Sequence, residues 1–200
     1  MSEAVADAHD PDAHLREHLV EARQVWRGSL LDVRRDHVRL SDGREATREY
    51  IAHPGAVMVV PLLDDGRLVL ERQWRHPLGR TLIEFPAGKI DPGETRLRCA
   101  QRELLEETGY SAREWAYACT LHNAVGYSNE GIDIWFARGL SLGERDLDEG
   151  EFVDVFTASV DELDELSRRG EVTDAKTLIG LLWLQNWLAG RWALGWQAGP

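Results

Sequence analysis

The stretch GKIDPGETRLRCAQRELLEETGY, residues 88–110, decides the fold of this 200-residue chain. A Pro-Gly pair at 92–93 precedes a run without helix-breaking residues that ends at Gly109, and this pattern predicts one helix. The apolar stripe of that helix would consist of Leu97, Ala100, Leu104 and Thr108. Glu103, Glu106 and Glu107 follow at the i, i+3, i+4 spacing of an adjoining face. The stretch therefore predicts three carboxylates beside a buried face.

Like charges at these spacings destabilise an isolated helix, so such glutamates either remain solvated or share a cation. Hard oxygen ligands of this kind suit magnesium or manganese. A Glu-x-x-Glu-Glu run alone is usually only a solvated helix face. Here it is framed by a regular set of further residues, which favours a metal site: Gly88, Glu94, Arg102 and Gly109.

The composition is that of an ordinary globular protein, with 43% hydrophobic residues and a formal net charge of -12. No Lys/Arg run is long enough to follow a phosphate backbone, so nucleic acid is not an expected partner. The first ten residues lack a basic and an apolar region, and no apolar run reaches membrane-spanning length. We therefore expect a cytoplasmic protein without a membrane partner. Cys99 and Cys119 are interpreted as buried free thiols.

Residues 1–20 are polar and are predicted to form an N-terminal tail. His14 and His18 could share a helical face and bind a metal, but a tail or frayed helix is favoured. Residues 21–52 show short runs separated by turns, with an Asp-Gly hairpin signal at 42–43, and predict a small antiparallel sheet.

Residues 53–200 are predicted to form the main domain. Its strands are expected at 55–63, 67–73, 81–85, 116–122, 132–137 and 152–157, and its last two helices at 159–168 and 174–188. The last helix is apolar around most of its circumference, which indicates burial in the core or against a partner. Trp192 and Trp196 could stack on a nucleobase, but packing is the favoured interpretation.

The stretch 88–110 resembles the Nudix box, and further motifs resemble the ADP-ribose pyrophosphatase branch of that family. These motifs occur at 48–50, 53–57, 73–75, 84–89, 126–130 and 174–177. The resemblance implies an α/β fold, the Nudix α/β/α sandwich with a mixed sheet, preceded by a small N-terminal antiparallel β-sheet. It also implies a homodimer that this N-terminal sheet helps to build.

The resemblance assigns roles to residues at the matching positions. Metal binding falls to the backbone carbonyl of Ala87 and to Glu103, Glu106 and Glu107. Glu130 matches a general base, so Glu130 and Glu107 are the catalytic candidates. Substrate binding falls to Arg48, Arg75, Glu84 and Gly126, with Arg48 reaching the nucleotide from its own or the other subunit. Support of the box falls to Gly88, Glu94, Arg102 and Gly109. Read without the resemblance, Arg75 would be a surface ion pair and Glu130 a loop residue.

The implied reaction is Mg²⁺-dependent hydrolysis of the pyrophosphate of ADP-ribose to AMP and ribose 5-phosphate, with Mn²⁺ as a substitute. Two positions depart from the usual pattern: Asn123 replaces a proline and Gly131 replaces a basic residue. They leave open hydrolysis of another nucleoside diphosphate sugar, such as GDP-mannose or a UDP-sugar. A sensor that binds ADP-ribose without cleaving it is a further alternative, although such domains tend to lose box glutamates.

Overall fold

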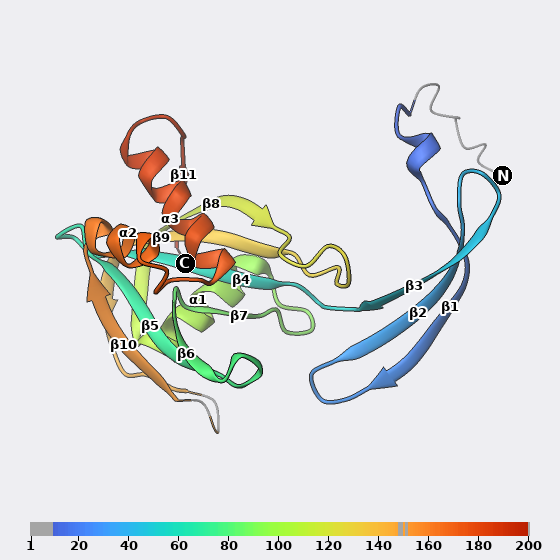
Figure 1. Ribbon diagram of the computed structural model, residues 1–200. Coiled ribbons are helices and arrows are strands. Elements are labelled where there is room, and N and C mark those ends of the chain that lie inside the picture. Colours follow the sequence, from blue (N-terminus) through green and yellow to red (C-terminus); the bar gives the residue numbers. More distant parts are fainter. Residues whose placement is uncertain (1–9, 148–149, 151, 200) are drawn as a thin grey trace. The chain divides into compact units, whose positions relative to one another are not determined.

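The computed structural model describes residues 10–147, 150 and 152–199, which form two compact units (Figure 1). One unit contains the described residues up to His53 together with Ala124–Asn129, and the other contains Pro54–Asn123 and the described residues from Glu130 on. The division after His53 lies beside the boundary predicted between residues 52 and 53. The sequence did not indicate that 124–129 belongs with the N-terminal unit.

The N-terminal unit is a three-stranded antiparallel sheet in the order β1-β2-β3. Its strands are β1 (His18–Arg27), β2 (Asp32–Arg39) and β3 (Glu45–Ile51), preceded by the short 3-10 helix η1 (Ala13–Leu15). Gly43, with φ of +88°, closes the turn between β2 and β3. Strand β1 begins inside the region predicted as a tail. His14 lies in η1 and His18 in β1, so the two histidines do not share a helical face.

The segment Ala124–Asn129 joins this unit through backbone contacts with the end of β3. The amide of Ile51 donates to the carbonyl of Tyr127 at 2.8 Å, and Ile51 and Ser128 form a parallel bridge. The amide of His53 donates to Oδ1 of Asn129 at 2.7 Å. The Gly-Tyr-Ser-Asn motif is thus tied to the residues that leave β3.

The second unit is built on a mixed sheet with the strand order β10-β5-β4-β9-β8-β11, with β6 paired to β5 and β7 to β4. Its strands are β4 (Ala56–Leu62), β5 (Leu68–Arg75), β6 (Arg80–Glu84), β7 (Ala87–Lys89), β8 (Tyr110–Leu121), β9 (Ile132–Leu142), β10 (Val153–Ala158) and β11 (Gly195–Ala198), with η2 (His76–Leu78) between β5 and β6. Strands β4 and β9 are parallel, and the other pairs are antiparallel. Strand β8 begins earlier and β9 ends later than predicted, because the two form one long hairpin-like pair.

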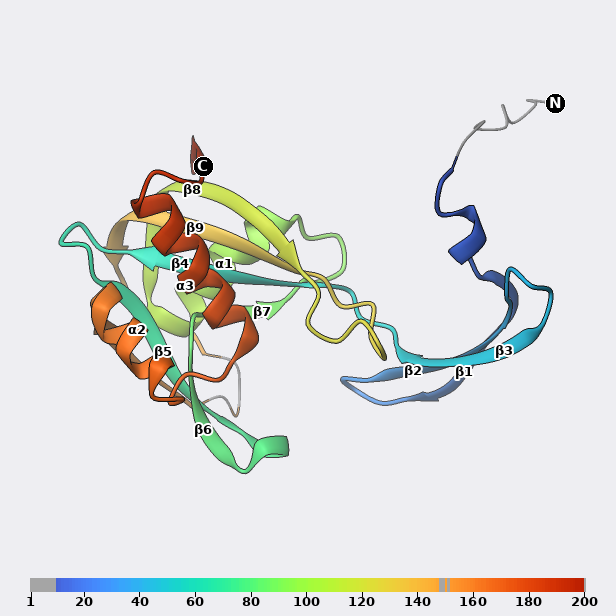
Figure 2. The same ribbon diagram turned by 45° about the horizontal axis from the view of Figure 1, so that its top comes forward.

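Helices cover both faces of this sheet, which gives the predicted α/β/α sandwich (Figure 2). Helix α1 (Arg96–Thr108) packs on the face that contains Val57 and Val59. Helices α2 (Val160–Arg168) and α3 (Ala175–Leu188) pack on the opposite face, with Met58 and Val60. Every residue of β4 is buried because both of its faces are covered, which explains its continuous apolar run.

The helix ends follow local sequence signals. Thr95 caps α1 by accepting from the amide of Arg98, and Gly109 ends it in the left-handed region at φ of +76°. Ser159 and Glu162 form a capping box on α2. Asp174 caps α3 by accepting from the amide of Thr177 at 2.9 Å. All three predicted helices are confirmed.

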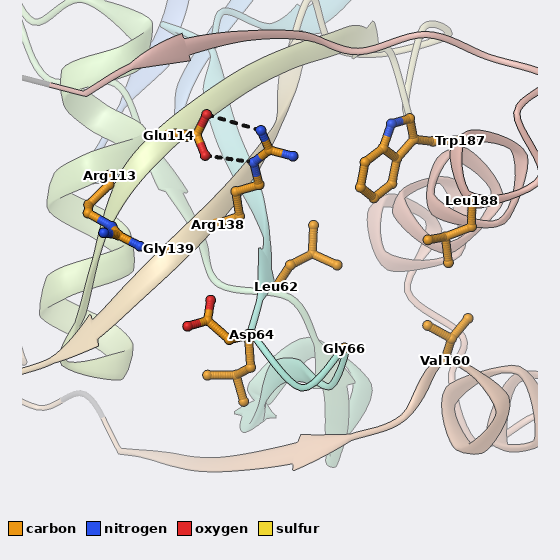
Figure 3. A pocket seen from close by; sticks show the side chains of 11 residues that line it. Leu62, Asp64, Gly66, Arg113, Glu114, Arg138, Gly139, Val160, Trp187 and Leu188 are labelled. Carbon is orange, nitrogen blue, oxygen red and sulfur yellow. Dashed lines mark hydrogen bonds and ion pairs between the residues drawn. The ribbon is translucent and has the colours of Figure 1, made fainter.

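The C-terminal tryptophans pack against the protein, as favoured by the sequence: Trp196 lies on β11, and Trp192 packs against Trp183 with ring centroids 4.4 Å apart. Trp187 contacts Phe136 and Trp196, with ring centroids 6.3 and 5.8 Å apart. The guanidinium of Arg138 lies 4.1 Å from the ring centroid of Trp196. Arg138 and Trp187 also line a pocket of about 310 Å³ that none of the predicted site residues lines (Figure 3).

Two further predictions concern burial. Cys99 is fully buried, as predicted, but Cys119 is only partly buried, because it lies on β8 near the edge of the core. Within the described part of the chain, no helix has the length and apolar character needed to cross a membrane.

Candidate functional site

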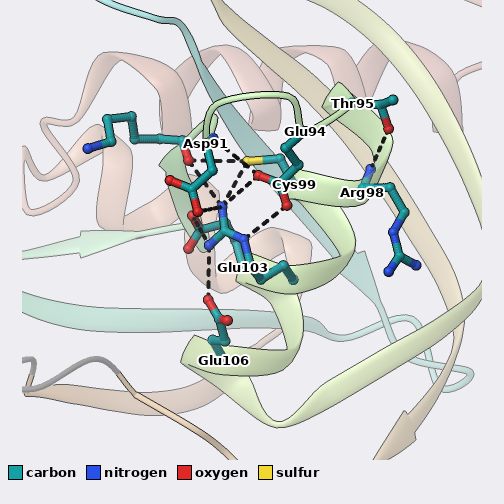
Figure 4. A network of polar contacts seen from close by, with 9 residues as sticks. Asp91, Glu94, Thr95, Arg98, Cys99, Glu103 and Glu106 are labelled. Atoms are coloured by element: carbon teal, nitrogen blue, oxygen red, sulfur yellow. Dashed lines mark hydrogen bonds and ion pairs between the residues drawn. The ribbon is translucent and has the colours of Figure 1, made fainter.

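Arg102 is the centre of a polar network on α1, and Figure 4 shows its partners Glu94, Glu103 and Glu106. Its Nε and Nη2 donate to the two carboxylate oxygens of Glu94 at 3.0 and 2.9 Å, and Nη2 also donates to the carbonyl of Lys89 at 3.1 Å. Its Nη1 donates to Glu103 at 2.7 Å and to Glu106 at 3.0 Å. One guanidinium therefore ties the loop before the helix to two of the three predicted metal ligands.

The charges of this network stabilise one another. The hydrogen bond with Glu94 raises the pKa of Arg102 above its usual value, although partial burial opposes this shift. The hydrogen bond from Arg102 likewise lowers the pKa of Glu94. Both groups stay ionised near neutral pH, as a structural support for the glutamates requires.

Glu103 lies directly over Gly88. A Cβ built on Gly88 would be 1.9 Å from Oε1 and 2.0 Å from Cδ of Glu103. A glycine at this position therefore leaves the space that the carboxylate fills. This contact gives a steric reason for the first residue of the box.

Glu107 is held by the same loop. Its Oε2 accepts a hydrogen bond of 2.9 Å from the amide of Ala87, and its side chain is almost fully buried. Strand β7 pairs with β4, with Ala87 opposite Met58, so the core fixes the loop that meets Glu107. The structure thus brings Ala87 into contact with Glu107, and both were predicted to bind metal.

Arg75 and Glu84 form a second polar cluster. The Arg75 guanidinium donates from Nε and Nη2 to the two oxygens of Glu84 at 2.7 and 2.8 Å. Glu84 also pairs with Lys176 of α3. The pKa of Arg75 is raised, first by the hydrogen bond with Glu84 and then by the charges of Glu84, Glu71 and Glu107. Glu84 lies three residues before Ala87 in the chain, so this cluster adjoins the strand whose amide donates to Glu107.

The pKa of Glu84 reflects two opposing effects. Burial, the largest single influence, raises it, while the hydrogen bond from Arg75 and the charge of Lys176 lower it. The net effect is that the pKa of Glu84 lies below the usual pKa of a glutamate. Glu84 is thus a buried carboxylate that its two cationic neighbours keep ionised. Arg75 is neither an isolated surface ion pair nor fully buried, since 37% of its side chain is exposed.

The residues of the box fit a divalent cation by their chemistry. Oxygens of Glu103 and Glu106 already converge on one cationic group, Nη1 of Arg102, and Gly88 leaves room for the Glu103 carboxylate. Hard carboxylate oxygens suit such an ion. Among the described residues, no three His, Cys, Asp or Glu side chains are grouped closely enough to hold a metal ion, and Arg102 is paired with Glu103 and Glu106.

The other predicted residues lie elsewhere or remain untested. Glu130 is partly buried and precedes β9 by one residue, Gly131. Gly126 is exposed in the segment 124–129, where an added Cβ would meet no atom within 4 Å. Arg48 belongs to the N-terminal unit and donates from Nε to Glu17 at 2.9 Å. Their roles in substrate binding or catalysis stay predictions.

Two residues next to Glu84 received no role from the sequence. Lys176 contacts Glu84 directly, and Oγ1 of Thr177 accepts from the amide of Phe85 at 3.0 Å. The sequence did contain a signal for these two residues, since residues 174–177 form one of the motifs that resemble the family. Its partner could not be read from the sequence, because Glu84 lies 92 positions away.

An α/β/α sandwich with the box glutamates on α1 is the arrangement that the resemblance to the Nudix family implies. The chain matches the family model described as "NUDIX domain" over residues 52–179. It therefore belongs to the Nudix family, whose hydrolases generally depend on divalent metal ions.

Several relatives match nearly the whole chain. The ADP-ribose pyrophosphatase of Bacillus subtilis is 37% identical over 173 residues, which cover 86% of this chain and 94% of that protein. The ADP-ribose pyrophosphatase of Mycobacterium tuberculosis is 35% identical, covering 82% and 80%. A methanol dehydrogenase activator of Bacillus methanolicus is 34% identical, covering 84% and 92%.

A solved structure agrees with these sequence relatives. The crystal structure of an ADP compounds hydrolase superposes with a TM-score of 0.79 at 26% identity, covering 88% of this chain and 96% of the other. The predicted fold and family are confirmed.

Proposed function

We propose that this protein hydrolyses the pyrophosphate bond of ADP-ribose to give AMP and ribose 5-phosphate. The observation that carries the proposal is that two clusters share one short segment, residues 84–87: Glu84 accepts the fork of Arg75, and the amide of Ala87 donates to Glu107. A carboxylate that suits a cation and a guanidinium that suits phosphate are thus both held by this segment. Relatives 37% and 35% identical are named ADP-ribose pyrophosphatases, which supports this substrate.

The proposed metal is Mg²⁺, with Mn²⁺ as a substitute, held by the Ala87 carbonyl, Glu103, Glu106 and Glu107. When bound, it would neutralise the diphosphate and lower the pKa of a coordinated water. Arg102, Glu94 and Gly88 would keep the glutamates in position through the contacts described above.

Arg75 would bind the diphosphate. Its Nε and Nη2 are used by Glu84, and within the described part of the chain its Nη1 donates no hydrogen bond. This nitrogen would donate to a phosphate oxygen, while Glu84 fixes the plane of the guanidinium. Arg48 and Gly126 remain proposed contacts of the nucleotide.

Glu130 would act as the general base. Its carboxylate would take a proton from the attacking water as the water oxygen bonds to phosphorus. The bond from that phosphorus to the bridging oxygen breaks, and the leaving phosphate keeps the electron pair. General bases of this kind typically contribute roughly a hundredfold to ten-thousandfold.

Hydrolysis of a different nucleoside diphosphate sugar is the second candidate, and Asn123 and Gly131 favour it. A Cβ at Gly131 would lie 3.1 Å from Cγ2 of Thr120, so a basic side chain there would require its neighbours to shift. The positive charge found at this position in related sequences is absent from Gly131. GDP-mannose and UDP-sugars are the compounds to compare.

A rate panel tests these assignments. The purified chain is incubated with Mg²⁺ and ADP-ribose, GDP-mannose or a UDP-sugar, and products are followed by phosphorus NMR with an EDTA control. Faster, metal-dependent release of AMP and ribose 5-phosphate from ADP-ribose supports the proposal. Faster cleavage of another compound transfers the assignment to it, while ADP-ribose-induced stabilisation without any product supports a binding module.

We also propose that the chain forms a homodimer through its N-terminal sheet. All residues of β1 are exposed, and four of them are large and apolar: Leu19, Val20, Val25 and Trp26. Strand β1 is also at the edge of its sheet, and an exposed edge strand with apolar side chains can pair with a second chain. We also propose a cytoplasmic location.

A further inference from the structure

Lys176 is one of two lysines among the 23 basic Lys and Arg residues of this chain, the other being Lys89. It lies in the first turn of α3, two residues after the cap Asp174. Only 11% of its side chain is exposed. A chain that uses arginine at nearly every basic position thus has a lysine at this enclosed place.

The Lys176 ammonium stands between two carboxylates. It forms a close ion pair with Glu84, and its Nζ is 3.1 Å from Oδ2 of Asp174. The same Asp174 oxygen accepts from the amide and hydroxyl of Thr177, at 2.9 and 2.7 Å. The start of α3 therefore fixes the ammonium against Glu84.

Glu84 cannot rely on solvent to stabilise its charge, because only 1% of its side chain is exposed. A buried carboxylate paired with one cation is held weakly unless further hydrogen bonds satisfy its oxygens. Lys176 supplies such a contact to Oε2, which also accepts from Nη2 of Arg75. The orientation of the Arg75 fork thus depends on an oxygen that Lys176 shares.

We propose that Lys176 is a positioning residue that holds Glu84, and through it the guanidinium of Arg75, in the orientation that binds the substrate diphosphate. This inference rests on the proposed function, because it requires a diphosphate substrate. Lys176 itself need not contact that substrate. The direction of the Glu84 pKa, lowered despite burial, agrees with the two-cation arrangement.

The geometry also explains why a lysine suits this position. Arg75 uses both oxygens of Glu84 for its two parallel hydrogen bonds. A second guanidinium would compete for the same pair of oxygens, whereas an ammonium is a compact charge that needs only one. Lys176 therefore neutralises the charge of Glu84, and Arg75 binds the substrate diphosphate.

A double-mutant cycle tests this dependence. Lys176→Met, Arg75→Met and the double variant are compared with wild type on the compound that wild type hydrolyses fastest. We expect Lys176→Met to raise KM roughly tenfold and to change kcat less than about threefold, as the loss of one charged hydrogen-bond contact predicts. The double variant should be no worse than Arg75→Met, because Lys176 acts through Arg75. Independent, multiplying effects on KM would overturn the proposal.

Two further variants control for folding. Arg169→Met removes an exposed basic side chain paired with Glu171 and should leave KM unchanged. If Lys176→Met does not fold, Glu84→Gln/Lys176→Met removes both buried charges together. This pair should fold and still show the raised KM, and a KM equal to that of wild type would exclude the positioning role.

A wild-type chain that hydrolyses no compound of the panel would refute the proposed function alone. The positioning role is then measured as affinity for ADP-ribose by calorimetry. Lys176→Met should weaken binding roughly tenfold, again by way of Arg75. Equal affinity of this variant and wild type would overturn the inference.

Discussion

The carboxylate of Glu103 fills the space that a side chain at Gly88 would need: a Cβ on the glycine would lie 1.9 Å from Oε1 of the glutamate. The two residues belong to different elements, β7 and α1. Strand β7 pairs with β4, and α1 packs on β4 as well. The glutamate can therefore reach its position only because residue 88 has no side chain. A single methyl group added at residue 88 should therefore have a large effect on activity.

Gly88→Ala should displace the Glu103 carboxylate and lower kcat/KM by at least roughly a hundredfold, since catalytic groups must be held within fractions of an ångström. Gly195→Ala is the matched control, because an added Cβ there meets no atom within 4 Å. Steady-state kinetics and thermal melting of both variants make the comparison. Full activity in Gly88→Ala would refute the assigned position of Glu103.

Glu107→Gln should nearly abolish turnover while the fold stays intact. The glutamine oxygen can still accept from the amide of Ala87, but the negative charge is lost. We expect kcat to fall more than about a hundredfold, in line with the loss of a major electrostatic contact. Glu45→Gln, at an exposed ion pair with Arg39, should have no effect. A Glu107→Gln variant that keeps most of the wild-type activity would refute the assignment of Glu107 as a metal ligand.

Glu130→Gln tests the proposed general base. We expect kcat to fall between roughly a hundredfold and ten-thousandfold, with KM little changed, because the base acts on water in the reaction step. Glu144→Gln, in the exposed loop after β9, serves as the control. A Glu130→Gln variant that keeps the kcat of wild type would assign the base to another residue.

The stability of the protein should fall at acidic pH partly through Glu84. Its folded pKa lies below the usual value, so its contribution is present above the unfolded pKa, about 4.3, and is lost as pH falls through the folded pKa. Glu84→Gln should remove this part of the pH dependence. Melting temperatures between neutral and strongly acidic pH check it. Parallel curves for the variant and wild type would contradict the linkage.

Trp26→Glu should convert the proposed dimer into a monomer. The side chain is 55% exposed on β1, beside other apolar residues of that strand, so a charge there would be buried unpaired in an interface. Light scattering coupled to size exclusion gives the mass. Phe152→Glu, an exposed aromatic of the other unit, should leave the mass unchanged. A monomeric wild type would end the dimer proposal.

Much of the fold was predictable because its signals are local. The helix over Arg96–Thr108 follows from its cap and its terminal glycine, and the continuous apolar run of β4 follows from burial on both faces. The ends of β8 were not predictable, since Tyr110–Ala112 becomes strand only by pairing with the end of β9. The partial exposure of Cys119 likewise depends on its place in the sheet.

The sequence by itself determined the box helix, the spacing of Glu103, Glu106 and Glu107, and the family, because these depend on neighbours within a few turns. Only the tertiary structure decided which distant groups meet. It placed Lys176 against Glu84 across 92 positions and tied Ala124–Asn129 to the end of β3. The physical reason is that such contacts are chosen by the packing of helices and strands on a shared core, which no local pattern specifies.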